Sequence, residues 1–189
     1  SLRGVLIFVG IIWAVWLIDW LFNLQLDSWG IVPRQLSGLA GVLFSPFLHV
    51  GFGHLLSNTV PLIVLLVLLM ATKSDPWIHV AELIVLSGGL LWLFGRNGSQ
   101  DVPVVHAGAS GLIYALIAYL IVAGFKEKRV VSIAVALLVG FLYGGSLLSG
   151  ILPTQKSVSW DGHLAGLVAG VILAIAFASS TSADTKELS

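Results

Sequence analysis

The chain has 189 residues, of which 58% are hydrophobic and 10% charged, and its mean hydropathy is +1.03. A soluble domain carries a larger share of charge on its surface, so this composition predicts a membrane protein. The nine basic and nine acidic residues cancel, which gives no reason to expect a nucleic-acid partner. The chain has no cysteine, which excludes disulfides, thiolate metal sites and a cysteine nucleophile.

Six apolar segments are long enough to cross a bilayer as helices, because a hydrocarbon core of about 30 Å needs roughly 20 residues. We expect these spans at approximately residues 4–24, 54–72, 77–95, 107–125, 130–149 and 162–179. The first segment is too long for the apolar part of a signal peptide and has no small-residue cleavage site after it. The sequence therefore predicts an all-α, six-helix membrane domain over residues 1–179, followed by a polar C-terminal tail at 180–189.

Basic residues favour one orientation of this domain, because Lys and Arg are retained on the cytoplasmic side during insertion. If the first span enters from the cytoplasm, six basic residues lie inside and three lie outside. The inner set is Arg3, Lys73, Lys126, Lys128, Arg129 and Lys186, and the outer set is Arg34, Arg96 and Lys156. This bias predicts a multi-pass protein with both termini in the cytoplasm, and we expect it in the plasma membrane of a prokaryote.

Polar residues gather at the outer starts of the second, fourth and sixth spans. They are His49, His54 and Asn58 in the first cluster, Gly108, Ala109, Ser110, Gly111 and Tyr114 in the second, and Gly162, His163, Gly166 and Gly170 in the third. Polar and ionisable groups inside a membrane are costly, so each cluster indicates a functional site. Because even-numbered spans all begin outside, helix alternation alone brings the three clusters to the same side of the membrane.

The three clusters together contain the groups that acyl transfer needs, namely a hydroxyl, an imidazole that takes its proton, and donors for the oxyanion. Ser110 and His163 supply the first pair. His54, Asn58 and the backbone N–H of Ser110 are the candidate donors, since His54 and Asn58 are four residues apart and share one helical face. Taken alone, the Gly-Ala-Ser-Gly motif is weak evidence, because small residues in membrane helices usually serve packing.

Glycines near the two catalytic candidates predict a close approach of the fourth and sixth spans. They are Gly108, Gly111, Gly162, Gly166 and Gly170, the last three in a small-xxx-small spacing. A hydrogen bond of roughly 2.6–3.2 Å between Ser110 and His163 depends on this packing. Ser110 is expected about 22–24 Å from the inner end of its helix, and so several Å below the outer boundary of the hydrocarbon core. A nucleophile at that depth needs a water-filled cavity.

Three motifs resemble those of the rhomboid intramembrane serine proteases: His-x-x-x-Asn from His54 to Asn58, Gly-x-Ser-Gly around Ser110, and a His before Gly-x-x-x-Gly at His163. The resemblance covers nearly the whole six-span chain. It implies a Ser–His dyad that uses no metal or cofactor, with Ser110 as nucleophile and His163 as general base. It also implies that His54, Asn58 and the Ser110 amide form the oxyanion hole.

The same resemblance implies supporting residues and a substrate class. Tyr114 matches a position that packs against the catalytic histidine, and His49 matches a histidine that helps to order the first loop. The implied substrates are single-span membrane proteins, cleaved in the bilayer near its extracytoplasmic face. Two positions depart from the family pattern: Ala40-Gly41 stands where a Trp-Arg pair is common, and Met70 where a glutamate is frequent.

Three other functions fit the pattern less well. A rhomboid-like protein that binds transmembrane segments without cutting them is expected to lose Ser110 or His163, and both are present. A small polytopic transporter needs polar residues along a path across the membrane, whereas the inner halves of these spans are almost wholly apolar. A zinc metalloprotease needs a motif such as His-Glu-x-x-His, which the sequence lacks.

The remaining polar residues near the spans are interpreted as structural. Asp161 is two residues before His163 and so faces away from it on a helix, which argues against a catalytic triad. His79 and His106 are expected at the membrane interface, and Glu82 has no evident partner. The sequence does not indicate the oligomeric state or the identity of the substrate.

Overall fold

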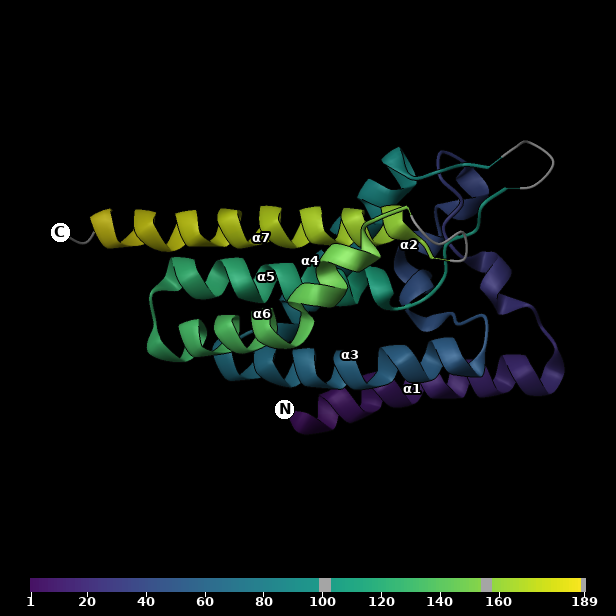
Figure 1. The fold of residues 1–189 in the computed structure, drawn as a ribbon, viewed down its shortest axis with the longest axis horizontal. Helices are drawn as coiled ribbons and strands as arrows, with labels where there is room; N and C mark the ends of the chain where they lie inside the picture. Colours follow the sequence, from purple (N-terminus) through teal and green to yellow (C-terminus); the bar gives the residue numbers. More distant parts are fainter. Residues whose placement is uncertain (99–102, 154–157, 188–189) are drawn as a thin grey trace.

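The computed structural model describes residues 1–98, 103–153 and 158–187, with side chains as far as Phe177. Its helices are α1 (Leu2–Phe22), α2 (Gly41–Phe44), α3 (Phe52–Thr72), α4 (Pro76–Phe94), α5 (Ser110–Glu127), α6 (Val130–Gly150) and α7 (Trp160–Glu187). The 3-10 turns η1 (Leu26–Trp29), η2 (Leu36–Gly38) and η3 (Ser45–Phe47) lie with α2 in the connection between α1 and α3. Figure 1 shows the long helices running side by side as one bundle.

Six helices in the described part of the chain are long and apolar enough to cross a membrane: α1, α3, α4, α5, α6, and α7 as far as Phe177. Each begins and ends within three residues of the expected span, which confirms the six-span, all-α architecture. The largest difference is at the fourth span, which begins at Ser110 because Ala109 is its N-cap. α7 continues as helix to Glu187, so a separate tail from residue 180 stays a prediction.

α5 is the central helix of the bundle. In its most apolar stretch 61% of the residues are buried, against 17% in α1, which lies at the edge. Every residue from Leu112 to Leu120 is buried, because this helix is apolar on nearly all sides and other helices surround it. Ser110 therefore stands at the start of the most enclosed element of the protein.

α5 and α7 approach each other closely because glycines lie at their contact. A Cβ atom at Gly166 would overlap the carbonyl oxygen of Gly111, and one at Gly170 would overlap the carbonyl oxygen of Ala115. Any larger residue there would move one helix away from the other. The small-xxx-small spacing of the sixth span thus marks a helix contact, as expected. At Gly111 itself an added Cβ would meet only the carbonyl oxygen of Gly162, at an ordinary 3.6 Å.

The connection between α1 and α3 folds back onto the bundle. Ile31 and His106 exchange two backbone hydrogen bonds of 2.9 Å. Arg34 Nη1 donates to the carbonyl oxygens of Leu93 (3.1 Å) and Gly95 (2.9 Å) at the C-terminal end of α4. The apolar side chains that this connection buries include Ile31, Val32, Val42 and Leu48. It lies at the end of the bundle where α3, α5 and α7 begin, which is called the cavity end below.

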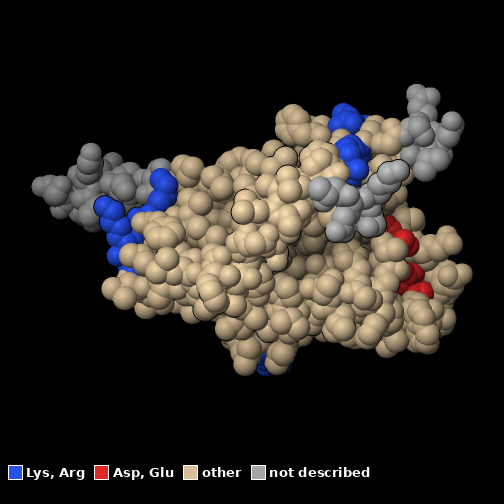
Figure 2. Space-filling view, viewed as in Figure 1, with Lys and Arg blue, Asp and Glu red and all other residues tan. Residues whose placement is uncertain are grey.

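The opposite end of the bundle carries a cluster of positive charge. Figure 2 shows basic side chains where α5 turns into α6, a connection that contains Lys126, Lys128 and Arg129. Uncharged side chains make up most of the middle of the same face, and both acidic and further basic side chains appear toward the cavity end. This distribution suits a helical bundle whose middle is surrounded by lipid.

Two polar pairs near that opposite end are buried or half-buried. Lys73 contacts the carboxylate of Glu127, and His79 Nδ1 lies 3.2 Å from Glu82 Oε2. His79 is buried and packs against the ring of Tyr119 (centroids 5.3 Å apart). The expectation that Glu82 lacks a partner was therefore wrong, because its carboxylate lies against His79 one helical turn away. The position of His79 at the membrane interface stays a prediction.

Candidate active site

Ser110 is the first residue of α5 and follows a sharp backbone turn. Gly108 has a φ of +123°, which L side chains rarely adopt, and its N–H donates to the Ser45 carbonyl at 2.9 Å. A Cβ at Gly108 would also overlap the ring of His54. Ala109 occupies the N-cap and has no side-chain oxygen, so the first N–H groups of α5 have no side-chain cap. These donors at the positive end of a helix dipole suit a negatively charged oxygen.

His163 lies in the first turn of α7 and is held by the end of α6. Its Nδ1 is 2.9 Å from the Gly150 carbonyl oxygen. Because a carbonyl oxygen only accepts, Nδ1 carries the proton and Nε2 has the lone pair in the neutral ring. The ring stacks on Tyr114, with centroids 4.1 Å apart and planes at 5°, as the resemblance implied. Tyr114 Oη in turn donates to the Ser146 carbonyl at 2.6 Å.

Ser110 and His163 line one cavity of about 570 Å³. Its helical walls are His54, Ser57, Asn58 and Pro61 of α3, Ser110, Ile113, Tyr114 and Ile117 of α5, Tyr143 and Ser146 of α6, and His163 of α7. The segments that lead into α5 and α7 contribute further residues, among them His106 and Ser159. The structure thus brings together, around one space, Ser110, His163, His54, Asn58 and Tyr114, which the sequence assigned to the chemistry or to packing against the catalytic histidine.

The predicted hydrogen bond between Ser110 and His163 is not formed in the described part of the chain. His163 uses Nδ1 for the Gly150 carbonyl, and Ser110 Oγ makes no side-chain hydrogen bond among these residues. Catalytic hydrogen bonds in substrate-free enzymes are commonly long and shorten only in the complex with substrate. The dyad therefore stays a prediction, for which the shared cavity and the histidine tautomer are the structural support.

The candidate oxyanion donors of α3 face the same cavity. Asn58 is 7% exposed, and its Nδ2 has no hydrogen-bond partner among the described residues. A buried N–H₂ group without a partner is costly, so such a group calls for an acceptor that binds there. His54 lies one helical turn before Asn58 and against Gly108, which places it next to the start of α5.

His49 lies behind the cavity wall and supports it. It is 3% exposed, its ring is 5.1 Å from that of His54, and its Nε2 accepts from the N–H of Ala109 at a long 3.5 Å. Burial, with a smaller contribution from the neighbouring His54, lowers the pKa of His49 to about 4, so the ring is neutral at pH 7. His49 thus contacts the residue before Ser110, which is a more direct connection to the site than ordering the first loop.

The family model of the Rhomboid domain matches residues 36–180, a range that contains every residue of this cavity. The chain belongs to the rhomboid family. Rhomboids are generally intramembrane serine proteases, and this rhomboid is a multi-pass membrane protein.

Mycobacterial proteins are similar to this rhomboid over most of its length. An uncharacterized protein of Mycobacterium tuberculosis (strain ATCC 25618 / H37Rv) is 42% identical over 173 residues, which are 90% of this chain and 72% of the relative. An uncharacterized protein of Mycobacterium leprae (strain TN) is 38% identical over 174 residues, which are 90% of this chain and 68% of the relative. These names state no activity, so the likeness supports the family and not a substrate.

A buried polar network beside the cavity of this rhomboid was not anticipated. His106 is 4% exposed and Asp161 8%. That His106 lies at the membrane interface stays a prediction, but its burial among polar partners was not expected. Asp161 binds Arg96 and makes no hydrogen bond to His163 among the described residues, in agreement with its spacing. The sequence does mark one side of this network, because Ser159 followed by an acidic residue in the first turn is typical of a helix start. Its partners Arg96 and His106, in the connection between α4 and α5, show no comparable sequence pattern.

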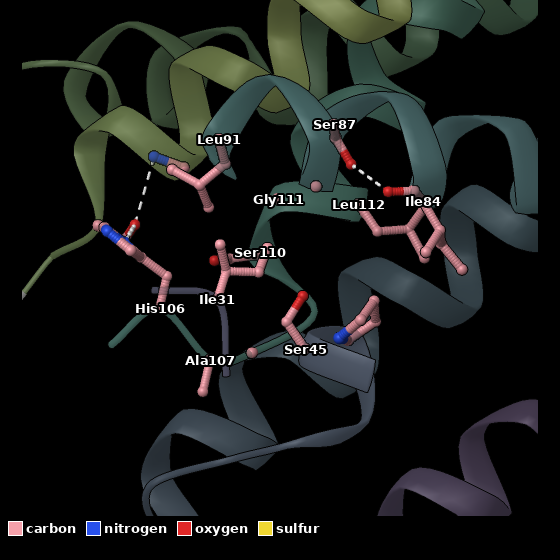
Figure 3. Close-up of a pocket in the computed structure, with 15 residues that line it drawn as sticks. Ile31, Ser45, Ile84, Ser87, Leu91, His106, Ala107, Ser110, Gly111 and Leu112 are labelled. Carbon is pink, nitrogen blue, oxygen red and sulfur yellow. Dashed lines mark hydrogen bonds between the residues drawn. The ribbon is translucent and has the colours of Figure 1, made fainter. Parts of the chain in front are cut away.

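A second, small cavity of about 30 Å³ lies behind Ser110. Figure 3 shows Ser45, Ser110 and His106 around it, with Ser87 of α4 nearby. The hydroxyl of Ser87 donates to the Leu83 carbonyl of its own helix at 2.6 Å. A space of this size with several hydroxyl groups in its wall has room for about one water molecule.

Proposed function

We propose that this rhomboid is a serine endopeptidase that cleaves membrane-anchored proteins with Ser110 as nucleophile and His163 as general base. The observation that supports this most is the hydrogen bond from His163 Nδ1–H to the Gly150 carbonyl. It leaves Nε2 with the lone pair, which is what a base for a serine hydroxyl requires. Ser110 supplies a hydroxyl on the same cavity, at a helix end whose N–H groups have no side-chain cap.

The proposed reaction needs only groups that line this cavity. Ser110 Oγ attacks the scissile carbonyl carbon while its proton passes to His163 Nε2. Asn58, His54 and the Ser110 N–H stabilise the oxyanion. As the intermediate collapses, His163 gives the proton to the leaving amine and an ester of Ser110 remains. Water then attacks that ester with His163 again as base, and the small cavity behind Ser110 has room to hold this water.

The substrate class and the side of cleavage form part of the same proposal. A cavity within a bundle of membrane-spanning helices receives substrates that are themselves anchored in the bilayer, such as single-span proteins. The cavity end is assigned to the extracytoplasmic side, because the opposite end carries Lys126, Lys128 and Arg129. Six spans bring both termini to one side, which is then the cytoplasm.

The decisive experiment is cleavage of a single-span substrate by the purified protein in detergent and in vesicles. We expect wild type to cleave, and Ser110→Ala and His163→Ala to lose activity by a factor of about 10³ or more. Ser57→Ala is the matched control, because Ser57 lines the same cavity but its Oγ donates to the His54 carbonyl at 2.9 Å. A fluorophosphonate should label wild type and Ser57→Ala but not Ser110→Ala. Undiminished cleavage by Ser110→Ala would exclude the dyad, and inhibition by EDTA would indicate a metal instead.

The oxyanion donors are tested separately. Asn58→Ala should lower kcat by about 10²–10³, the usual effect of losing one donor, while the thermal midpoint stays near that of wild type. Asn58→Asp is the informative partner, because it keeps the size but places a carboxylate where negative charge develops. Unchanged kcat in Asn58→Ala, His54→Ala and their double variant would remove both side chains from the oxyanion hole.

A rhomboid that binds transmembrane segments without cutting them is the second candidate. The missing Ser110–His163 hydrogen bond is the observation that favours it. In that case wild type and Ser110→Ala would retain a single-span protein equally well, neither would cleave it, and the fluorophosphonate would label neither.

A further inference from the structure

His106 lies where the segment before α5 meets the start of α7. It is buried, and it precedes Ser110 by four residues. Its backbone is paired in both directions with Ile31, through two hydrogen bonds of 2.9 Å. Gly30 stands against it so closely that a Cβ there would overlap the His106 carbonyl oxygen. The position of His106 is therefore fixed by the folded connection between α1 and α3.

The side chain of His106 reaches the N-cap of the helix that carries His163. Nδ1 lies 2.7 Å from Ser159 Oγ, and Nε2 lies 3.3 Å from the Arg96 carbonyl oxygen. Because that carbonyl only accepts, Nε2 carries the proton and Nδ1 accepts from the Ser159 hydroxyl. Ser159 Oγ also accepts from the Gly162 N–H at 3.3 Å, and the Ser159 carbonyl accepts from the His163 N–H at 3.0 Å.

A charged pair closes the network on its other side. The Asp161 carboxylate accepts from the Arg96 backbone N–H at 2.8 Å and from Arg96 Nη2 at 3.1 Å. Arg96 Nη2 also lies 3.4 Å from the Val158 carbonyl oxygen, and Asp161 Oδ2 is 3.7 Å from His106 Nε2. The first turn of α7 is thus bound both to the end of α4 and to the segment that leads into Ser110.

We propose that His106 is a positioning residue for the dyad: through Ser159 it sets the place of His163 relative to Ser110. The bond joins His106, four residues before Ser110 of α5, to Ser159, four residues before His163 of α7. A displacement of about 1 Å at a reacting group can cost 10²-fold in rate. This inference rests on the proposed function. It adds a residue that touches neither the scissile bond nor the transferred proton.

The contribution of His106 to folding has to be separated from positioning. A buried polar network stabilises the fold whether or not it orients the dyad, so loss of activity with loss of stability proves nothing. His106→Asn makes the distinction, because its side-chain oxygen can take the place of Nδ1 and accept from Ser159, whereas His106→Ala cannot. Both variants lose Nε2 and its contact with the Arg96 carbonyl.

The experiment measures kcat, KM and thermal midpoint for wild type, His106→Ala, His106→Asn, Ser159→Ala and the double variant His106→Ala/Ser159→Ala. We expect His106→Ala and Ser159→Ala each to lower kcat by about 10²-fold with KM within about twofold. The double variant should be no worse than either, and His106→Asn should recover at least about tenfold of the loss at a similar thermal midpoint. Fluorophosphonate labelling of Ser110 should slow in the same order.

His79→Ala is the matched control, because His79 is also buried and paired but lies at the opposite end of the bundle. It should lower the thermal midpoint and leave kcat unchanged. The inference is overturned if His106→Ala keeps wild-type kcat, if His106→Asn is as impaired as His106→Ala, or if the losses of the two single variants add. If His106→Ala does not fold, Ser159→Ala, at a half-buried position, decides the question alone. Absence of cleavage by wild type would instead remove the proposed function.

Discussion

Near the cavity, the two helices that flank α5 are attached to it in different ways. On the α7 side the backbones are nearly in contact, since Gly166 and Gly170 leave no room for a Cβ. On α6, by contrast, Gly140, Gly144 and Gly145 have no heavy atom within 4 Å of an added Cβ. The cavity lies on this second side, where Tyr143 and Ser146 form part of its wall.

This difference shows which geometry the fold fixes and which it leaves open. The serine helix and the histidine helix form one closely packed pair, so the separation of the two reacting residues is set by backbone contact. Near the cavity, α6 contacts this pair through carbonyl groups, those of Ser146 to Tyr114 and of Gly150 to His163. Only at the far end does α6 lie against the α5 backbone, where a Cβ at Gly124 would overlap the Ser132 carbonyl oxygen among the described residues. Gly140, Gly144 and Gly145 of α6 thus face open space, whereas Gly150 of α6, like Gly166 and Gly170 of α7, marks a close contact, and only the structure distinguishes them.

The largest effect is expected from Gly166→Ala, which disturbs the close contact between α5 and α7. The added Cβ overlaps the Gly111 carbonyl oxygen one residue after Ser110, so α7 must move away from α5. We expect cleavage to fall by about 10²-fold or more, because the dyad separates by roughly 1 Å. Gly144→Ala is the matched control on the open side, where the extra methyl meets nothing within 4 Å and should raise helix propensity. Equal activity in the two variants would refute the comparison.

A smaller effect is expected from Gly150→Ala, because the Gly150 carbonyl of α6 accepts the hydrogen bond from His163. A Cβ there overlaps the Tyr114 hydroxyl and lies 3.1 Å from His163 Nδ1. A side-chain end can move where a backbone cannot, so we expect kcat to fall by about tenfold with little change in thermal midpoint. Gly145→Ala, in open space on the same helix, should behave as wild type. A full loss of activity would show that α6 matters as much as α7.

The next prediction concerns stability and tests His49, which contacts the residue before Ser110. Burial lowers the pKa of His49 from 6.5 to about 4, so the unfolded chain binds a proton more readily between these two values. Stability should therefore be full above pH 6.5 and should fall as the pH drops toward 4. The total loss is about 3 kcal/mol, or roughly 6–12 °C in Tm for a chain of this size.

His49→Gln makes this test specific, because its side-chain oxygen can still accept from the Ala109 N–H but cannot be protonated in this range. Tm measured from pH 7.5 to 4.5 should fall less steeply in the variant than in wild type. Parallel curves would show that other groups control the acid sensitivity.

The sequence was sufficient for the parts of this protein that depend on local pattern. Apolar length indicates the spans, and helix alternation places the starts of α3, α5 and α7 together, so it could be predicted without coordinates that Ser110, His163 and Asn58 lie around one space. The glycine contacts of α7 also follow from a local spacing.

What could not be read from the sequence depends on partners far apart along the chain. His106 and Ser159 are 53 residues apart, and Arg96 and Asp161 are 65 apart. Nothing local marks such pairs, because their contact is produced by the folded connection of α1 to α3 and by the packing of α4 on α7. The absent Ser110–His163 bond is of the same kind, since it depends on fractions of an ångström in helix packing.

The smallest effect on activity is expected at the end of α5 away from the cavity. There Lys73 contacts Glu127, which also accepts from Ser132 Oγ at 2.8 Å. Burial lowers the pKa of Lys73, and so does the nearby Arg129, which shows that the charged lysine is destabilised at this site. Glu127→Gln should therefore lower Tm by a few degrees, because it leaves a half-buried charge without its partner.

If α5 is positioned for chemistry by α7 alone, kcat of Glu127→Gln should stay within about twofold of wild type, since the cavity lies at the other end of the helix. The double variant Lys73→Met/Glu127→Leu should regain the lost stability, because two apolar side chains replace a pair whose desolvation offsets its attraction. A fall in kcat as large as that of Gly166→Ala, at an unchanged Tm, would contradict this. It would mean that the Lys73–Glu127 pair fixes the position of α5 along the helix axis, and with it the position of Ser110. Close packing against α7 would then fix only the distance between the two helices.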